Sequence, residues 1–240
     1  MMPLPKIATP TYELELPSTG KSIKYRPFLV KEEKVLVIAL ESEDNKQITN
    51  AIKAVLKSCV LTKGIKVETL PTFDIEYLFL HIRGKSVGEE LDVTLICPDD
   101  GETEVSVQID LDDIQIQKND EHTNQVKLDN SLMMELRYPS LDQFIKSNFD
   151  FDDKNQMDQS FALIASCIDK IYSEDEVWAT ADCTKKEMND FLESMNSSQF
   201  KEIEKFFETM PKLKHEIKVT NPKTGVESDV VLEGLASFFA

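Results

Sequence analysis

The sequence predicts an α+β fold of helical segments and β-hairpins, arranged as two similar halves that each combine helices with one hairpin. Two observations predict this class. Segments of alternating polarity flank short turns rich in proline and glycine, as is typical of hairpins. Between the hairpins, apolar residues recur every three or four positions, which indicates helices that bury one stripe. With 240 residues, of which 41% are hydrophobic, the chain can build a substantial core in one large domain or two small ones.

The first third of the chain predicts one hairpin followed by three helices. Residues 12–16 and 22–26 alternate in polarity around a turn that contains Gly20. The spacing of apolar residues then predicts helices over 31–42, over about 46–61, and from the expected cap Thr72 to just before Gly84. The apolar side of the first helix is expected to consist of Val35, Leu36, Ile38, Ala39 and Leu40.

The middle of the chain predicts mostly β-structure. The clearest hairpin joins residues 91–97 to residues 104–111. Shorter strands are expected in the acidic stretch that follows, at 114–117, 125–128 and 132–138. We expect the domain boundary in this stretch, which gives an N-terminal α+β domain (1–112), a connecting β and loop region (113–150) and a C-terminal helical domain with a closing hairpin (151–240).

The last third predicts three helices and a closing hairpin. An apolar stripe that runs to Ile171 indicates a helix from about Lys154, and the loop expected at 172–182 holds Trp178, the only tryptophan. Thr184 and Glu187 form a capping-box pattern at the start of the next helix. A further helix over about 198–209 precedes a hairpin formed by residues 214–220 and 227–232.

The turns of the second and the last hairpin share one design, Cys97-Pro98-Asp99-Asp100-Gly101 and Asn221-Pro222-Lys223-Thr224-Gly225. A zinc knuckle of the Cys-Pro-x-Cys-Gly kind would point two thiolates at one metal from each turn. Only Cys97 carries a thiol at such a position, and a tetrahedral site needs four ligands. We therefore expect no metal, and interpret both sequences as proline- and glycine-built turns.

No motif predicts catalysis or a cofactor. His81, His122 and His215 lie far apart, and the sequence has no nucleophile elbow, phosphate-binding loop or dinucleotide fingerprint. The four cysteines form no CxxC pair, and the aspartates after Cys97 should raise the pKa of its thiol. The sequence therefore indicates a protein that is not an enzyme, although a site assembled only by the fold stays an alternative.

The net charge of −17 disfavours binding to nucleic acids and to anionic membranes. No apolar run is long enough to span a bilayer, so we expect a protein made in a cytoplasm. Aromatic side chains often anchor protein interfaces. The residues expected to bind a partner are therefore Trp178 and, near the end of the sequence, Leu235, Phe238 and Phe239.

Several segments together resemble the T4-type phage baseplate protein family. They are Tyr25-Arg26-Pro27-Phe28 with Lys31-Glu32-Glu33-Lys34, the Cys97-Pro98 hairpin, Phe191-Leu192-Glu193-Ser194-Met195, Phe206-Phe207-Glu208-Thr209-Met210-Pro211-Lys212-Leu213, and the closing hairpin with Phe238-Phe239. Some relatives carry paired cysteines in the two hairpins. This sequence lacks them, which argues against a family zinc role here.

The resemblance implies a structural protein that helps to build the hub or wedge region of a contractile-tail baseplate. Its expected partners are other hub and wedge proteins and further copies of itself, with no role for a cofactor. Its expected location is the host cytoplasm during assembly and then the tail baseplate of the virion. The sequence supports an alternative almost equally, which is an assembly chaperone that shapes the hub and is absent from the mature particle.

Overall fold

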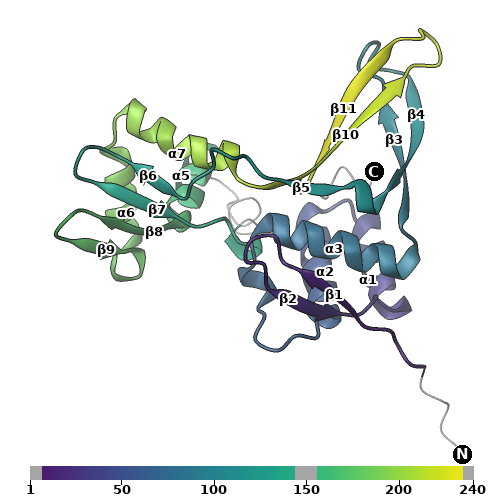
Figure 1. Ribbon diagram of the computed structural model, residues 1–240, viewed down its shortest axis with the longest axis horizontal. Coiled ribbons are helices and arrows are strands. Elements are labelled where there is room, and N and C mark those ends of the chain that lie inside the picture. The colour runs from purple at the N-terminus through teal and green to yellow at the C-terminus, as the bar shows by residue number, and fades with distance from the viewer. Residues whose placement is uncertain (1–6, 144–155, 235–240) are drawn as a thin grey trace, which may run out of the picture. The chain divides into compact units, whose positions relative to one another are not determined.

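The structure of the protein, a computed structural model, describes residues 7–143 and 156–234 (Figure 1). It confirms a mixed α+β architecture made of helices and several small antiparallel sheets. The chain packs into two units. Unit 1 comprises residues 1–67, 73–116 and 212–240, and unit 2 comprises residues 68–72 and 117–211.

Unit 1 combines three helices with three small sheets. The helices are α1 (Val30–Glu41), α2 (Asn45–Cys59) and α3 (Thr72–Val87). The sheets are the hairpin of β1 (Tyr12–Glu15) and β2 (Ser22–Tyr25), the hairpin of β3 (Glu90–Ile96) and β4 (Glu104–Asp110), and a sheet in which β10 (Lys212–Thr220) lies between β11 (Glu227–Glu233) and β5 (Gln115–Gln117). All three hairpins expected from the sequence are therefore present.

A buried ion pair fixes the start of α1. Arg26 follows β2, and its Nη2 lies 2.9 Å from Oε1 of Glu32, whose side chain is only 7% exposed. The second oxygen of Glu32 accepts a hydrogen bond from the backbone N–H of Leu29 (2.9 Å), and Ser58 of α2 donates its hydroxyl to Oε1 (2.7 Å). Burial alone would raise the pKa of Glu32, but these hydrogen bonds together lower it to about 2.

Helix α3 corrects one expectation, because it continues through Gly84 to Val87 instead of ending before the glycine. A Cβ atom at position 84 would lie 2.9 Å from Cδ1 of Leu111, which is closer than normal packing allows. Glycine at this position therefore leaves room for the side chain of Leu111, which follows β4. The N-terminal turn of α3 holds the β1–β2 turn, since the buried Asp74 accepts hydrogen bonds from the backbone N–H (3.0 Å) and the hydroxyl of Ser18.

The two hairpins β3–β4 and β10–β11 lie side by side in unit 1 (Figure 1). They share one apolar core with Leu80 of α3, whose further members are Leu91, Val93, Leu95, Ile109, Leu111, Ile114, Leu213, Val219 and Leu232. The closing hairpin thus packs with N-terminal elements, whereas the sequence analysis assigned it to a C-terminal domain over 151–240. Two similar helix-plus-hairpin halves are not shown, because both hairpins belong to one unit.

Unit 2 is an antiparallel sheet packed with three helices. The strands follow the order β6 (Gln125–Lys127), β7 (Met133–Leu136), β8 (Ile168–Tyr172) and β9 (Val177–Ala179), and the helices are α5 (Gln156–Cys167), α6 (Lys185–Glu193) and α7 (Ser197–Thr209). The core includes Met134, Ile168, Ile203 and Phe206. Thr184 and Glu187 form the expected capping box at the start of α6.

Two expectations for unit 2 are wrong. The helix predicted to run to Ile171 ends at Cys167, and Ile168 and Ile171 belong to strand β8. These two buried residues are three positions apart, which is a helical spacing. The spacing arises in a strand because the register of the β7–β8 pair shifts, so that Ile168 lies opposite Leu136 and Ile171 lies opposite Met134. Trp178 lies on strand β9, not in a loop. Within the described residues, no helix has the length and apolar character needed to cross a bilayer.

Candidate functional site

The two similar turns meet side by side and are joined by hydrogen bonds. The side-chain amide of Asn221 donates to Oδ1 and Oδ2 of Asp99 at 3.0 and 3.1 Å, and to Oδ2 of Asp100 at 2.9 Å. Thr224 adds a bond from its hydroxyl to Oδ2 of Asp99 at 2.5 Å. We call these four residues the turn clasp. It connects positions more than 120 residues apart in the sequence, and Asn221 within it is fully buried.

Each turn also stabilises itself in the same way. The backbone N–H of Gly101 donates to the carbonyl of Cys97 (2.9 Å), and that of Gly225 donates to the carbonyl of Asn221 (2.8 Å). Both glycines have a positive φ, 67° and 75°, which favours glycine over residues with a Cβ. The local similarity seen in the sequence is therefore a similarity of turn geometry.

The environment of the clasp favours the ionised form of its two aspartates and disfavours the thiolate form of the neighbouring Cys97. Hydrogen bonds from Thr224 and Asn221 lower the pKa of Asp99, and bonds from Thr103 and Asn221 lower the pKa of Asp100 below its usual range. Burial raises the pKa of the Cys97 thiol, and the charges of Asp99 and Asp100 raise it further, as the sequence predicted. These shifts favour the ionised form of Asp99 and Asp100, which accepts the hydrogen bonds of the clasp, and the protonated thiol form of Cys97.

Three of the four clasp residues occupy positions at which two Cys-Pro-x-Cys-Gly knuckles would hold a metal. Those positions are Cys97 and Asp100 in the first turn, and Asn221 and Thr224 in the second. An amide and a hydroxyl are poor partners for a tetrahedral zinc site, which prefers thiolate and imidazole. Among residues 7–143 and 156–234, no group of three or more His, Cys, Asp or Glu side chains is placed to bind a metal ion. The residues present therefore do not fit zinc.

The three histidines lie at separate places, and each has its own hydrogen-bond partners. Nδ1 of His81 lies 2.8 Å from the carbonyl of Tyr77, and Nδ1 of His215 lies 3.3 Å from the carbonyl of Asp113. In unit 2, His122 lies between the hydroxyls of Thr209 (2.9 Å) and Tyr138 (3.0 Å), and burial lowers its pKa. Each ring therefore takes part in local packing and hydrogen bonding.

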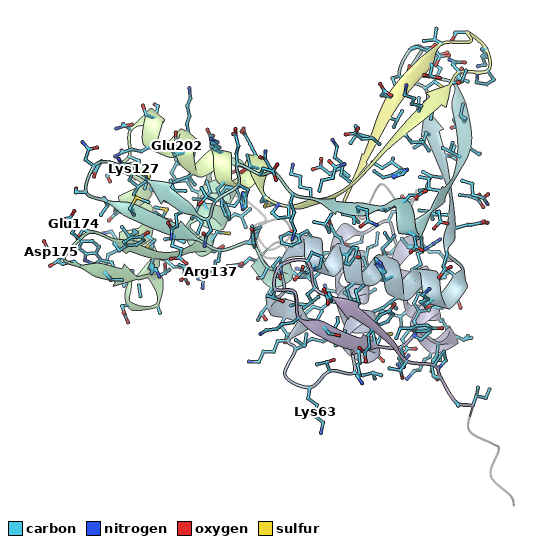
Figure 2. All side chains as sticks on the ribbon, viewed as in Figure 1. Lys63, Lys127, Arg137, Glu174, Asp175 and Glu202 are labelled. Carbon is cyan, nitrogen blue, oxygen red and sulfur yellow. The ribbon has the colours of Figure 1, made fainter. Side chains whose placement is uncertain are left out.

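Among the expected partner-binding residues, Trp178 is 42% exposed and follows Val177, which is 67% exposed. Both lie on β9, an edge strand of the unit 2 sheet. Figure 2 shows Glu174 and Asp175 pointing away from the sheet at the turn before β9. The other three expected residues, Leu235, Phe238 and Phe239, lie outside the described residues.

An exposed apolar surface on α1 was not expected from the sequence. Ala39 of the expected apolar side is buried, but Val35, Ile38 and Leu40 of the same set are exposed. The signal was present in the sequence, because the run from Val35 to Leu40 is apolar on every side of the helix and leaves no polar face for solvent.

The sequence model of a family described as "T4 bacteriophage base plate protein" matches residues 9–240 of the chain. The chain is also similar to the baseplate hub assembly protein gp26 of Enterobacteria phage T4. The two sequences are 24% identical over 231 residues, which are 95% of this chain and 97% of that protein. No solved structure matches the chain at a significant level. The family match therefore extends over both packing units and includes both turns of the clasp.

Proposed function

This chain belongs to the T4 bacteriophage base plate protein family, and on that premise we propose that it is a structural component of a contractile-tail baseplate. In this role it contributes to the assembly of the hub and wedge region through protein–protein contacts, without catalysis. Its partners are other hub and wedge proteins and further copies of itself. It acts in the host cytoplasm during assembly and is retained in the tail baseplate of the virion.

The observation that carries this proposal is the similarity, over almost the full length of both chains, to a protein named for the assembly of the baseplate hub. Two physical features support it. The acidic surface, with a net charge of −17, keeps the free protein apart from nucleic acid and from non-specific partners. Exposed apolar side chains gather on α1 and β9, and such clusters are typical of surfaces that a partner covers.

We propose Trp178 and the segment 235–240 as partner contacts. Trp178 belongs to an edge strand, whose free backbone groups can pair with a strand of another protein. A large exposed aromatic ring beside such an edge is a suitable anchor for the contact. Leu235, Phe238 and Phe239 are likewise large apolar residues, and they lie in the last six residues of the sequence.

The second candidate function is that of an assembly chaperone that leaves before the particle is complete. The name of the T4 relative, a hub assembly protein, favours this candidate. Both functions require the same contacts during assembly. They differ in whether those contacts persist in the finished baseplate.

The experiment that tests the proposed function is the loss of the protein during infection. A phage whose copy of the gene carries an amber codon is grown in a host with and without a suppressor tRNA. We expect that, without suppression, hub complexes do not form and tails lack complete baseplates, while capsids and sheath protein accumulate. Complete, functional baseplates without the protein would contradict both candidates.

A further inference from the structure

Helix α1 carries the densest group of exposed apolar side chains in the described part of the chain. Of the fourteen large apolar side chains that are exposed, six lie between positions 29 and 40: Leu29, Val30, Val35, Val37, Ile38 and Leu40. Scattered single residues of this kind are ordinary, but six within twelve residues, in and next to one helix, are not. The group therefore indicates a surface that another segment covers.

A cavity of about 300 Å³ lies between this helix and its neighbours in unit 1. Its lining is mostly apolar and includes Leu36 and Leu40 of α1, Ile52 of α2, and Phe79 and Val87 of α3. Leu40 and Val87 are 40% and 53% exposed, so the cavity continues into the exposed apolar surface. Its volume lies at the lower end of the range for ligand pockets and can admit a few side chains of a docked segment.

Arg83 of α3 lines the same cavity, and its charge has no partner in the part of the chain that the structure describes. Its Nη1 atom is buried and makes no hydrogen bond, and no ion pair joins it to Glu33 or Asp92, which also line the cavity. Burial lowers the pKa of Arg83. A buried guanidinium N–H without an acceptor is costly, and a carboxylate is the acceptor that matches its geometry best.

We propose that α1 and this cavity form a docking site for a segment of another baseplate protein that presents apolar side chains together with one carboxylate. The apolar side chains cover α1 and enter the cavity, and the carboxylate pairs with Arg83. Charge complementarity selects this occupant, because an entirely apolar segment would leave the guanidinium unpaired. The inference rests on the proposed function in one respect, which is that the occupant is a protein of the same assembly.

Site-specific photo-cross-linking in infected cells tests the proposal. A photoactivatable residue replaces Val37 of α1, which is 47% exposed, and in a matched control it replaces Val231 of β11, which is 49% exposed. We expect position 37, and not position 231, to cross-link to one segment of another baseplate protein, and that segment to contain an aspartate or glutamate among apolar residues. Cross-links only to residues 235–240 of this chain, only to a second copy, or equally from both positions would overturn the proposal.

Arg83→Met provides a second measurement that separates docking from folding. Methionine removes the unpaired charge and keeps an apolar side chain, so the melting temperature of the isolated protein should stay unchanged or rise. The cross-link from position 37 should fall roughly tenfold, as expected when a central interface residue is lost. A large fall in melting temperature, or an unchanged cross-link, would overturn the assigned role of Arg83.

A charge exchange completes the test. With Arg83→Glu the cross-link should disappear, and replacing the carboxylate of the identified segment by lysine should restore it. Failure of this rescue would overturn the proposed pairing. The proposed function fails on a different result, which is complete baseplates without the protein, so the two ideas can be rejected separately.

Discussion

The side-chain amide of Asn221 donates hydrogen bonds to both carboxylate oxygens of Asp99, at 3.0 and 3.1 Å. The amide oxygen of Asn221 meanwhile accepts the backbone N–H groups of Lys223 (2.8 Å) and Thr224 (3.3 Å) in its own turn. One buried side chain thus organises its own hairpin turn and connects it to the other hairpin. The paired hairpins therefore have a polar connection at their turns as well as the apolar core between their strands.

Asn221→Ala should lower the free energy of unfolding by about 1–3 kcal/mol, because the change leaves buried hydrogen-bonding groups without a partner. Asn221→Asp should lower it further at pH 7, since a third carboxylate would face Asp99 and Asp100. Urea unfolding of the purified protein measures both values. Lys223→Ala, at an exposed position in the same turn, is the control and should change the free energy little. Equal stability of the Asn221 and Lys223 variants would show that the clasp does not stabilise the fold.

A variant with Asp100→Cys, Asn221→Cys and Thr224→Cys, together with the native Cys97, should bind one zinc ion. The two turns already have the backbone form of a knuckle pair, and the side chains of Asn221 and Asp100 lie in contact. Co²⁺ substitution would give the absorption of a tetrahedral thiolate site. A control that carries Asp99→Cys in place of Asp100→Cys has its thiol one position out of register and should bind much more weakly. Equal binding by both variants would contradict the proposed correspondence of the turns.

Glu32→Gln should lower the free energy of unfolding at pH 7 by about 2 kcal/mol, because it removes the charge that pairs with Arg26. The pKa of Glu32 in the folded protein is about 2, below its ordinary value of 4.5. The stabilisation is therefore fully present above pH 4.5 and is lost as the pH falls towards 2. Chemical unfolding between pH 2 and 7 should show the two proteins converging at the acidic end. A difference that does not depend on pH would contradict this assignment.

Deletion of residues 235–240 should weaken association with partner proteins and leave the fold largely intact. Trp178→Ala should do the same, because the indole is 42% exposed and contributes little to the core. Co-purification of hub complexes measures the association, and thermal unfolding measures whether the fold is intact. Trp178→Phe is the control and should keep part of the binding. If the deletion abolishes folding, the segment belongs to the core and not to an interface.

Much of the fold could be predicted from local patterns. The hairpins were recognisable because alternation and turn residues both act within a few positions, as in β3–β4 and its turn at Cys97 to Gly101. The capping box of Thr184 and Glu187 is equally local. The continuation of α3 through Gly84 was not predictable in this way, because the side chain that packs against the glycine, Leu111, lies in a later element.

The errors and omissions have a common physical origin, which is contact between distant parts of the sequence. Ile168 and Ile171 have helical spacing, and only the register shift against β7 explains their burial in a strand. Asn221 and Asp99 looked like two independent turn residues until the fold brought them together. The cavity around Arg83 likewise needs three helices to exist. Each of these features depends on contacts between residues that are distant in the sequence, which local patterns do not encode.

Quantitative mass spectrometry, which compares purified particles with lysate of the infected cells, tests whether the protein is a structural component of the baseplate. A structural component should be present in the particles at a fixed, small copy number per tail, in a constant ratio to other baseplate proteins. Abundance in the lysate together with absence from the particles would contradict retention in the baseplate. That result would identify the protein as an assembly chaperone, whose contacts through α1 and Trp178 are made and released before the particle is complete.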